Sequence, residues 1–366
     1  MPVLLILVIL VALALQRYFV RRAQDVRNIR YECKPSVRAC EPGDVFLVHS
    51  DLSNTGYRES TALYIEEHFP RELKVLEAGQ YNIVVLRNDC RLYNSSAVIG
   101  ARQQVKRSLR ASIDRRGEYR FSYAEFFAGD FLGLREYYYR KENDARIVIY
   151  PKRIENEVFL QSFSSVADEI ARSRQLLEDP ISVCGYDPYT GREPMRAISW
   201  TQSAVRNELI VKRFDPVWQR SVRIVLDLQY HGEFDCHHER QELCFSIART
   251  VCEALERRQI GYRLITNASL SDGISSFRSE GDMGGSYRKI LYTLGIAQPR
   301  AVCSLKEIMH AACADAARQA LIVLVATRQD EDVSLELARA KARAGVQIVT
   351  LFADALLPTP KGGTDA

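Results

Sequence analysis

Apolar residues form an unbroken run from Pro2 to Leu15, directly after the first residue of the chain. As a helix, residues 2–20 rise about 28 Å, roughly the thickness of the hydrocarbon core of a bilayer. No Lys or Arg precedes the run, although a cleaved signal peptide normally carries positive charge there. The pattern therefore predicts an uncleaved transmembrane anchor over residues 2–20, with a cleaved signal peptide as the alternative.

The charges that follow the run predict its orientation. Five arginines come after it and none before it, namely Arg17, Arg21, Arg22, Arg27 and Arg30. Loops rich in Lys and Arg tend to stay on the cytoplasmic side of a membrane. We therefore expect a single-pass protein of the cell membrane that contacts the lipid bilayer through this helix and keeps its soluble domains in the cytoplasm.

Residues 31–150 show short apolar runs separated by turn residues. Val45–Val48 and Tyr81–Leu86 are such runs, and Tyr119–Tyr123 alternates apolar and polar positions with a period of two. Short runs of this kind are typical of strands in antiparallel sheets. The pattern predicts an antiparallel β-sandwich domain over residues 31–150.

Longer apolar runs separated by helical patterns follow in residues 181–357, after a connector at residues 151–180. Strands are predicted at Val222–Leu228, Tyr262–Thr266, Ala320–Ala326 and Val346–Phe352, and helices at Glu239–Arg258, Tyr287–Leu294, Leu305–Ala314 and Val333–Ala344. Apolar strands joined by helices indicate a parallel sheet that is covered on both faces. We predict an α/β fold with a doubly wound parallel sheet here, and a disordered tail at residues 358–366.

Composition is that of a globular protein with a mild net charge. The 366 residues are long enough for two domains, and the formal charge of +4 does not favour nucleic acid as a partner. The nine cysteines are odd in number and irregularly spaced, which indicates reduced thiols in a reducing compartment.

The most specific pattern lies between Gly191 and Phe214. Its fixed positions are Arg196, Ile198, Trp200, Ser203, Ala204 and the run Leu209–Val211. The pattern resembles the signature of the family called domain of unknown function fifty-eight. Two positions depart from that signature, since Arg192 replaces an Asp and Val205 replaces an Arg. A weaker similarity extends the resemblance upstream to about Arg115.

The resemblance implies a membrane anchor joined to a von Willebrand factor A-like domain. Proteins of this kind are bacterial or archaeal and are often encoded beside AAA+ ATPases of the MoxR type and other membrane proteins. The resemblance therefore implies a non-enzymatic, membrane-tethered adapter or assembly factor that docks such an ATPase or its client. It also implies that Arg196, Trp200 and Ser203 pack the entry segment against the sheet, with Trp200 as a large buried side chain.

An A-like domain usually carries a metal site at the end of its first strand, with the pattern Asp-x-Ser-x-Ser. This chain has Asp227, Gln229 and His231 at those positions, so both Ser ligands are lost. Mg²⁺ requires several oxygen ligands in near-octahedral geometry. We therefore expect a degenerate site, no cofactor, and a structural role for Asp227 at the end of its strand. A denser group, from His231 to His238, is interpreted as a polar loop before a helix, with a Zn²⁺ site as the alternative, because its spacing is not an established zinc pattern.

No established catalytic motif occurs in the sequence. Cys184 is a lone cysteine, and Ser199 and Ser203 have no His nearby in sequence. Two alternatives to the adapter stay open. One is an envelope-facing receptor for a ligand, which requires paired cysteines. The other is an unrecognised hydrolase that uses Asp227 together with His231.

Ligands of doubly wound sheets bind outside the carboxyl ends of the strands. The polar residues that follow the predicted strands are Asp227, Thr266, Asn267, Thr327, Arg328 and Asp330. We expect these residues to form a rim that docks the partner protein through hydrogen bonds and charge pairs.

Overall fold

The computed structural model describes most of the chain. The described residues are 2–24, 28–57, 59–60, 63–77, 83–86, 90–129, 136–157, 159–161, 163–164, 168, 178–191, 193–216, 222–229, 237–270, 277–280, 287–314, 321–344 and 347–356. The chain divides into two compact units. The first comprises Met1–Lys152 with Leu294–Ile296, and the second comprises Arg153–Thr293 with Ala297–Ala366.

Helix α1 (Pro2–Gln24) opens the first unit. Among the described residues, no helix combines the length and the apolar character that crossing a membrane requires. The unbroken apolar run ends before Gln16, so it rises only about 21 Å against the roughly 30 Å of a bilayer core. The predicted transmembrane anchor and the single-pass location in the cell membrane are therefore wrong.

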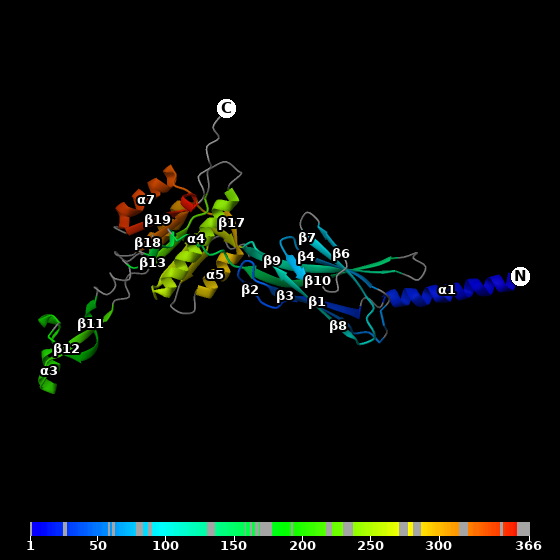
Figure 1. Cartoon of the computed structure of the whole chain (residues 1–366), viewed down its shortest axis with the longest axis horizontal. Helices are drawn as coiled ribbons and strands as arrows, with labels where there is room; N and C mark the ends of the chain where they lie inside the picture. The colour runs from blue at the N-terminus through cyan, green and yellow to red at the C-terminus, as the bar shows by residue number, and fades with distance from the viewer. Residues whose placement is uncertain are drawn as a thin grey trace, which may run out of the picture. The chain divides into compact units, whose positions relative to one another are not determined.

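Two β-sheets make up the rest of the first unit (Figure 1). The four-stranded sheet has the order β1 (Ile29–Pro35), β3 (Phe46–Asn54), β8 (Gln104–Ser112), β5 (Lys74–Glu77). The six-stranded sheet has the order β2 (Ala39–Cys40), β10 (Glu136–Ile149), β9 (Gly117–Gly129), β4 (Leu63–Pro70), β7 (Cys90–Ala97), β6 (Ile83–Leu86). Neighbouring strands run antiparallel, except that β2 runs parallel to β10.

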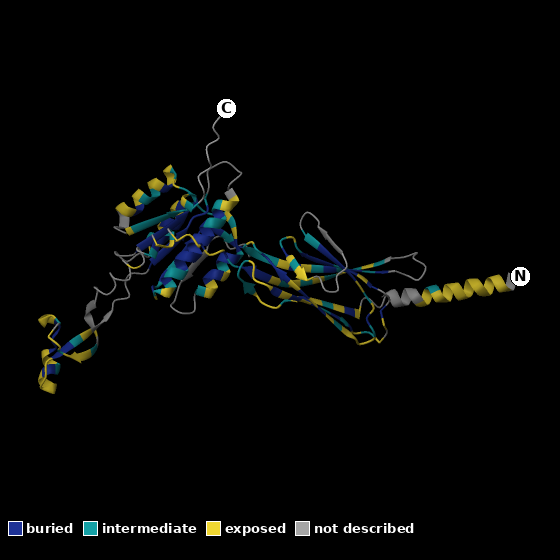
Figure 2. Ribbon diagram, viewed as in Figure 1, coloured by how far each residue is buried: buried dark blue, intermediate teal, exposed yellow. Residues whose placement is uncertain are grey.

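The core of this unit follows from alternation along the strands. In β3, Phe46 and Val48 are buried while Leu47 between them is exposed. Phe69 lies at the centre, with its ring centroid 5.1 Å from that of Tyr93 and 5.6 Å from that of Phe121. Figure 2 shows the same alternation as dark and light bands along the strands. Because successive side chains point to opposite faces, each strand gives one face to the core and the other to solvent.

The second unit contains a five-stranded sheet with helices (Figure 1). The strand order is β16 (Phe277–Glu280), β14 (Tyr262–Thr266), β13 (Val222–Leu226), β18 (Leu321–Ala326), β19 (Gln347–Phe352). The helices are α4 (His237–Arg257), α5 (Tyr287–Ile296), α6 (Leu305–Ala314) and α7 (Glu331–Ala344), and a 3-10 helix, η4, spans Ala353–Leu356. The pairs among β14, β13, β18 and β19 are parallel, and the edge strand β16 is antiparallel.

Burial explains why the central strands are apolar apart from Arg223, whose buried guanidinium donates to the carbonyl of Ala312. Every residue of β13 and β18 is buried, as expected for strands with packed layers on both faces. Helices α6 and α7 supply one layer, in which Ile308 and Val333 pack with Val225 and Leu324 of the sheet. Helix α4 contacts β13 and β18 as well. This packing fixes the ends of the strands, where the sequence predicted a binding rim.

The predicted fold class is wrong as a description of the whole chain. Most strand pairs are antiparallel, no membrane-crossing helix is found among the described residues, and only one sheet contains a series of parallel strands. Part of the segment assigned to a single A-like domain forms separate antiparallel pairs: β11 (Glu178–Pro188) with β12 (Ile210–Pro216), and β15 (Ala268–Leu270) with β17 (Ala297–Ala301). Apolar runs do not specify strand direction, and that ambiguity is the physical reason for the error.

Candidate functional site

Asp227 directly follows β13 and is held by donors from the protein itself. The side-chain amide of Asn267 donates to Asp227 Oδ1 over 2.6 Å, and the backbone N–H of Gln229 donates to the same oxygen over 3.0 Å. The residue is only 2% exposed, and its own N–H donates to Val325 of the neighbouring strand. Asp227 is thus a buried residue whose hydrogen bonds connect the ends of β13, β14 and β18.

Asn267 completes this connection from the end of β14. Its side-chain oxygen accepts the backbone N–H of Leu228 over 2.9 Å, and its amide also donates to the carbonyl of Cys303 over 3.2 Å. Asn267 has no exposed surface. Both ends of the amide are therefore used, which fits a role in positioning the loop after β13.

Gln229 has its side-chain oxygen occupied in the same way. That oxygen accepts the backbone N–H of Leu305 at the start of α6, over 3.1 Å. The Thr327 hydroxyl donates to the backbone carbonyl of Gln229 over 3.1 Å. A cation here would have to displace these bonds to reach Asp227 or Gln229. His231, the third residue of the predicted degenerate metal site, lies outside the described residues.

The predicted docking rim is largely inaccessible. Its residues Asp227, Thr266, Asn267 and Thr327 are each at most 2% exposed. Asp330 is half-buried and caps α7, because its carboxylate accepts the backbone N–H of Val333 over 2.9 Å. Arg328, also half-buried, is the other rim residue with surface. The structure brings the rim residues to one strand edge, but four of the six cannot contact a partner.

The signature segment forms a small module beside β11 and β12. Arg196 lies in the 3-10 helix η2 (Met195–Ala197), and helix α3 (Trp200–Arg206) follows. The Ser203 hydroxyl donates to the carbonyl of Ser199 over 2.8 Å and accepts the N–H of Ile210 over 2.9 Å. Ser203 therefore ties the short helix to β12.

Trp200 corrects the expectation of a buried aromatic anchor, because it is 64% exposed. Ala204 is exposed as well, and Ser203 is the buried residue of the helix. The seven-residue helix packs through the small side chain of Ser203, and Trp200 remains outside that contact. The resemblance identified a motif but not the face of the helix that packs.

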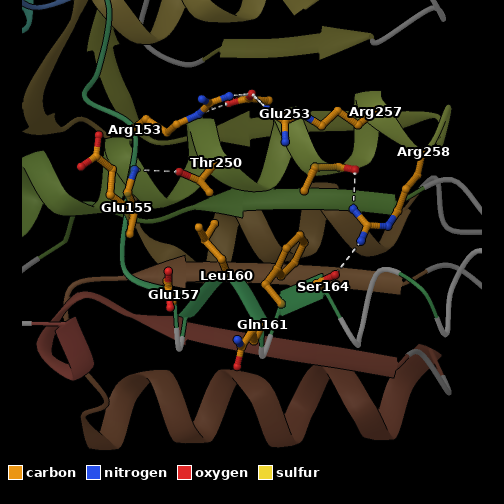
Figure 3. A pocket seen from close by; sticks show the side chains of 13 residues that line it. Arg153, Glu155, Glu157, Leu160, Gln161, Ser164, Thr250, Glu253, Arg257 and Arg258 are labelled. Carbon is orange, nitrogen blue, oxygen red and sulfur yellow. Dashed lines mark hydrogen bonds and ion pairs between the residues drawn. The ribbon is translucent and has the colours of Figure 1, made fainter.

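A groove of about 580 Å³ runs beside the second half of α4 (Figure 3). Its apolar lining residues are Ile154, Leu160, Phe163 and Ala254. The backbone N–H of Ile154 donates to the hydroxyl of Thr250 on α4 over 3.3 Å, which attaches this segment to the helix. The groove thus combines a partly apolar floor with walls from two segments distant in sequence.

Charged side chains of both signs surround the groove. Glu253 accepts from Arg153 over 2.9 Å and from Arg257 over 2.6 Å. Arg258 donates to Asp168 over 2.7 Å and to the hydroxyl of Ser164 over 2.7 Å. Arg257 is the most exposed of the three arginines in these pairs, with 66% of its side chain accessible. An apolar floor surrounded by a polar, exposed rim is typical of protein-binding surfaces.

Burial makes three of the described cysteines poor nucleophiles. Those whose side chains are described are free, and Cys33, Cys244 and Cys252 are buried. Burial, with the nearby Glu67 carboxylate, raises the pKa of the Cys33 thiol to about 12. Burial also raises the pKa of Cys252 above its ordinary value. Thiols with raised pKa values stay protonated at neutral pH and are poor nucleophiles.

Two sequence candidates add nothing further to a site. Cys184 lies within β11. Of the polar group from His231 to His238, residues 231–236 lie outside the described ones, and His238 is exposed on the first turn of α4. One group that the sequence did not indicate is Glu66, His68 and Glu125, whose ligand atoms lie within 4.8 Å of one another. The spacing of Glu66 and His68 by two is a local signal, but Glu125 joins them only through strand register.

No known protein family matches the chain by sequence, and no curated protein matches it. Solved structures that resemble parts of it include a CARDB domain from Pyrococcus furiosus, with 10% identity, a TM-score of 0.20, and coverage of 32% of this chain and 86% of that one. A non-cellulosomal cohesin from Archaeoglobus fulgidus shows 10% identity and a TM-score of 0.22 over 37% of this chain and 97% of that one. A type II cohesin domain from Acetivibrio cellulolyticus shows 8% identity and a TM-score of 0.22 over 33% and 95%. Similarities of this size assign neither fold nor function.

Proposed function

We propose that this chain is a non-enzymatic adapter that binds another protein through its second unit. The observation that carries the proposal is the closed strand edge around Asp227. Its carboxylate accepts from Asn267 and Gln229, and Gln229 is itself bonded to Leu305. The place where a sheet with parallel strands usually binds a small ligand is thus filled by the protein's own hydrogen bonds. We therefore expect the second unit to bind its partner through exposed surface residues.

The proposed partner is an AAA+ ATPase of the MoxR type, or a client of that ATPase. This part rests on the resemblance of the segment Arg196–Ala204 to the signature of the domain of unknown function fifty-eight family. The exposed Trp200 supports a contact role for this segment, because large exposed aromatic side chains are enriched at interfaces.

The groove beside α4 is the proposed docking surface for the ATPase, in place of the buried rim. Leu160 presents 37% of its surface to solvent on the groove floor, and Arg153 and Arg257 are accessible at its edge. Negative charges, including Glu155 and Glu157, line the same groove. A partner segment that carries an apolar residue between charges of both signs fits this arrangement.

Capture of a purified MoxR-type ATPase from the same genome on the immobilised chain tests the proposal. We expect capture to depend on whether ATP is present, to survive EDTA, and to weaken as salt is raised, because exposed charges are screened. Leu160→Asp should reduce the affinity at least about tenfold, as expected for the loss of an apolar contact in an interface. The matched control is Leu335→Asp on α7, the same substitution at an exposed position outside the groove.

The thermal melting temperature of each variant should be measured alongside, so that weaker capture is not mistaken for unfolding. If the ATPase is not captured in either nucleotide state, the proposed partner is wrong. If Leu160→Asp folds and binds as well as the control variant does, the groove is not the docking surface.

A further inference from the structure

The outer face of the six-stranded sheet in the first unit brings together two carboxylates and an imidazole. Glu66 and His68 lie two residues apart on β4, so they share a face of the sheet. Glu125 on β9 stands directly opposite Glu66 in the antiparallel register. One ligand atom from each side chain falls within 4.8 Å of the other two.

His68 is oriented by its neighbours so that one ring nitrogen faces the carboxylates. Only 6% of the residue is exposed, and its ring stacks on Tyr123 with the centroids 4.1 Å apart. Nδ1 lies 3.6 Å from the sulfur of Cys90. Nε2 is buried, makes no hydrogen bond, and lies 3.3 Å from Oε2 of Glu125. A metal-binding histidine usually has its other ring nitrogen held by a fixed partner. Here Nδ1 faces Cys90, and a metal ion at Nε2 would lie between that nitrogen and Glu125, whose other oxygen accepts from the Tyr138 hydroxyl over 2.8 Å.

The two glutamates form a like-charge pair that the sheet has to tolerate. Residues directly opposite one another in an antiparallel pair have their Cβ atoms about 5 Å apart, and equal charges there are destabilising. Arg140 stands opposite Glu125 on β10, but its guanidinium is paired with Glu142 over 2.7 Å and lies 3.6 Å above the ring of Tyr123. A cation between the carboxylates would remove the repulsion.

A second buried polar atom without a hydrogen bond lies on the strand beside β4. Asn94 on β7 stands opposite Glu66 in the register, so both lie on the same face of the sheet. It is 6% exposed, and its side-chain oxygen is buried without a hydrogen bond. Buried polar atoms without partners are uncommon, and each calls for an explanation such as an ion. Asn94 therefore offers a neutral oxygen on the strand beside β4, on the same face as the three primary ligands.

We propose that Glu66, His68 and Glu125 bind a divalent transition-metal ion of the zinc class. Zinc ligands at about 2.0–2.1 Å in tetrahedral geometry lie about 3.3 Å apart, which is the separation of His68 Nε2 and Glu125 Oε2. Two ligands of one ion cannot lie more than about 4.2 Å apart at these bond lengths, so any pair between that distance and the 4.8 Å limit of the group has to move closer on binding. Glu66 and Glu125 are only partly buried and can rotate to do so.

The ligand set favours zinc over magnesium. Mg²⁺ requires oxygen ligands in a strict octahedron and keeps its waters, whereas imidazole nitrogen together with carboxylate suits Zn²⁺. Three protein ligands leave a fourth position for water or for the Asn94 oxygen. The bound ion would connect β4 with β9, two strands that meet only through long-range pairing. This site lies in the first unit and does not depend on the proposed adapter function.

Titration of the whole metal-free chain with Zn²⁺, and separately with Co²⁺ as a coloured substitute, tests the site. We expect one ion bound per chain in the wild type, with Co²⁺ absorption bands of nitrogen and oxygen ligation and without a thiolate charge-transfer band. His68→Gln and Glu125→Gln should each weaken the affinity about 100-fold or more, since each removes a direct ligand and changes outside the ligand set already cost 10–100-fold. His49→Gln, an exposed histidine in the same unit, is the matched control and should leave the affinity unchanged.

Two results would overturn the proposal. One is an affinity that His68→Gln and Glu125→Gln leave unchanged. The other is a Co²⁺ spectrum with thiolate bands, which would place the ion at a cysteine. Should His68→Gln fail to fold, Glu66→Gln replaces it, because Glu66 is partly exposed and its amide keeps the shape of the side chain while weakening the ligand.

Discussion

Two carboxylates, Asp227 at a strand edge and Glu125 on an outer sheet face, lie beside neighbouring strands. The two positions differ in whether a ligand atom remains that could bind a metal ion. At Asp227, Asn267 and Gln229 already donate to the carboxylate, and the residue is 2% exposed. Beside Glu125, the buried Nε2 of His68 has no hydrogen bond. The strand edge that the sequence indicated is filled by the protein's own hydrogen bonds. At the position that the sequence did not indicate, Tyr138 donates to one oxygen of Glu125, but Nε2 of His68 keeps no hydrogen bond. Unused ligand atoms, more than acidic residues as such, therefore indicate a metal site.

The largest effect on the free energy of unfolding should follow from Asn267→Ala, which removes hydrogen bonds at the strand edge of Asp227. Asn267 is fully buried, and its amide both donates to Asp227 and accepts from Leu228. Its loss leaves a buried carboxylate without its main donor, which should lower the free energy of unfolding by about 3 kcal/mol. Urea denaturation followed by circular dichroism measures this.

The control for that change is Gln329→Ala, an exposed position near the end of β18. It should alter the free energy of unfolding by less than about 0.5 kcal/mol. A loss below about 1 kcal/mol for Asn267→Ala would show that the hydrogen bonds around Asp227 are not what holds this edge together.

A smaller effect on the free energy of unfolding, of opposite sign, is expected from Glu66→Gln beside Glu125. In EDTA, removal of one charge from the Glu66 and Glu125 pair should raise the free energy of unfolding by about 0.5 kcal/mol. With Zn²⁺ present the wild type should be the more stable of the two, because only it keeps both carboxylates for the ion. Glu72→Gln, at a half-buried position in the same unit, is the control and should show no reversal. An order of stability that Zn²⁺ does not change would mean that this pair binds no cation.

Local apolar patterns predicted several elements of the second unit closely. The strand Tyr262–Thr266 and the helix Leu305–Ala314 have the predicted bounds, and α7 starts two residues before the predicted Val333. These elements bury a continuous or periodic set of side chains, so their signal lies within a few residues of sequence. Strand pairing, by contrast, depends on distant partners, which is why the separate antiparallel pair of β11 and β12 was not predicted.

Site prediction failed where it depended on tertiary packing. Trp200 matched a motif, but a motif does not say which helix face is buried, and the side chain is exposed. Glu125 lies 57 positions after His68 in the chain, and only the register of β4 with β9 brings them together. The docking rim was placed at the correct strand ends, yet the burial of Thr266 and Asn267 could not be read from their polarity.

The most direct test of whether Asp227 or the Glu125 cluster binds a metal ion uses the wild type, Asp227→Asn and His68→Gln. Each protein is first stripped of metal, and its melting temperature is then measured with EDTA, with Mg²⁺ and with Zn²⁺. An ion that binds only the folded chain stabilises it by about 2.7 kcal/mol at one hundred times its dissociation constant, which is readily seen as a shift in melting temperature. We predict that Zn²⁺ raises the melting temperature of the wild type and of Asp227→Asn but not of His68→Gln, and that Mg²⁺ raises none of them. A rise with Mg²⁺ that Asp227→Asn abolishes and His68→Gln retains would contradict the account, because it would show that the strand edge is the open metal site.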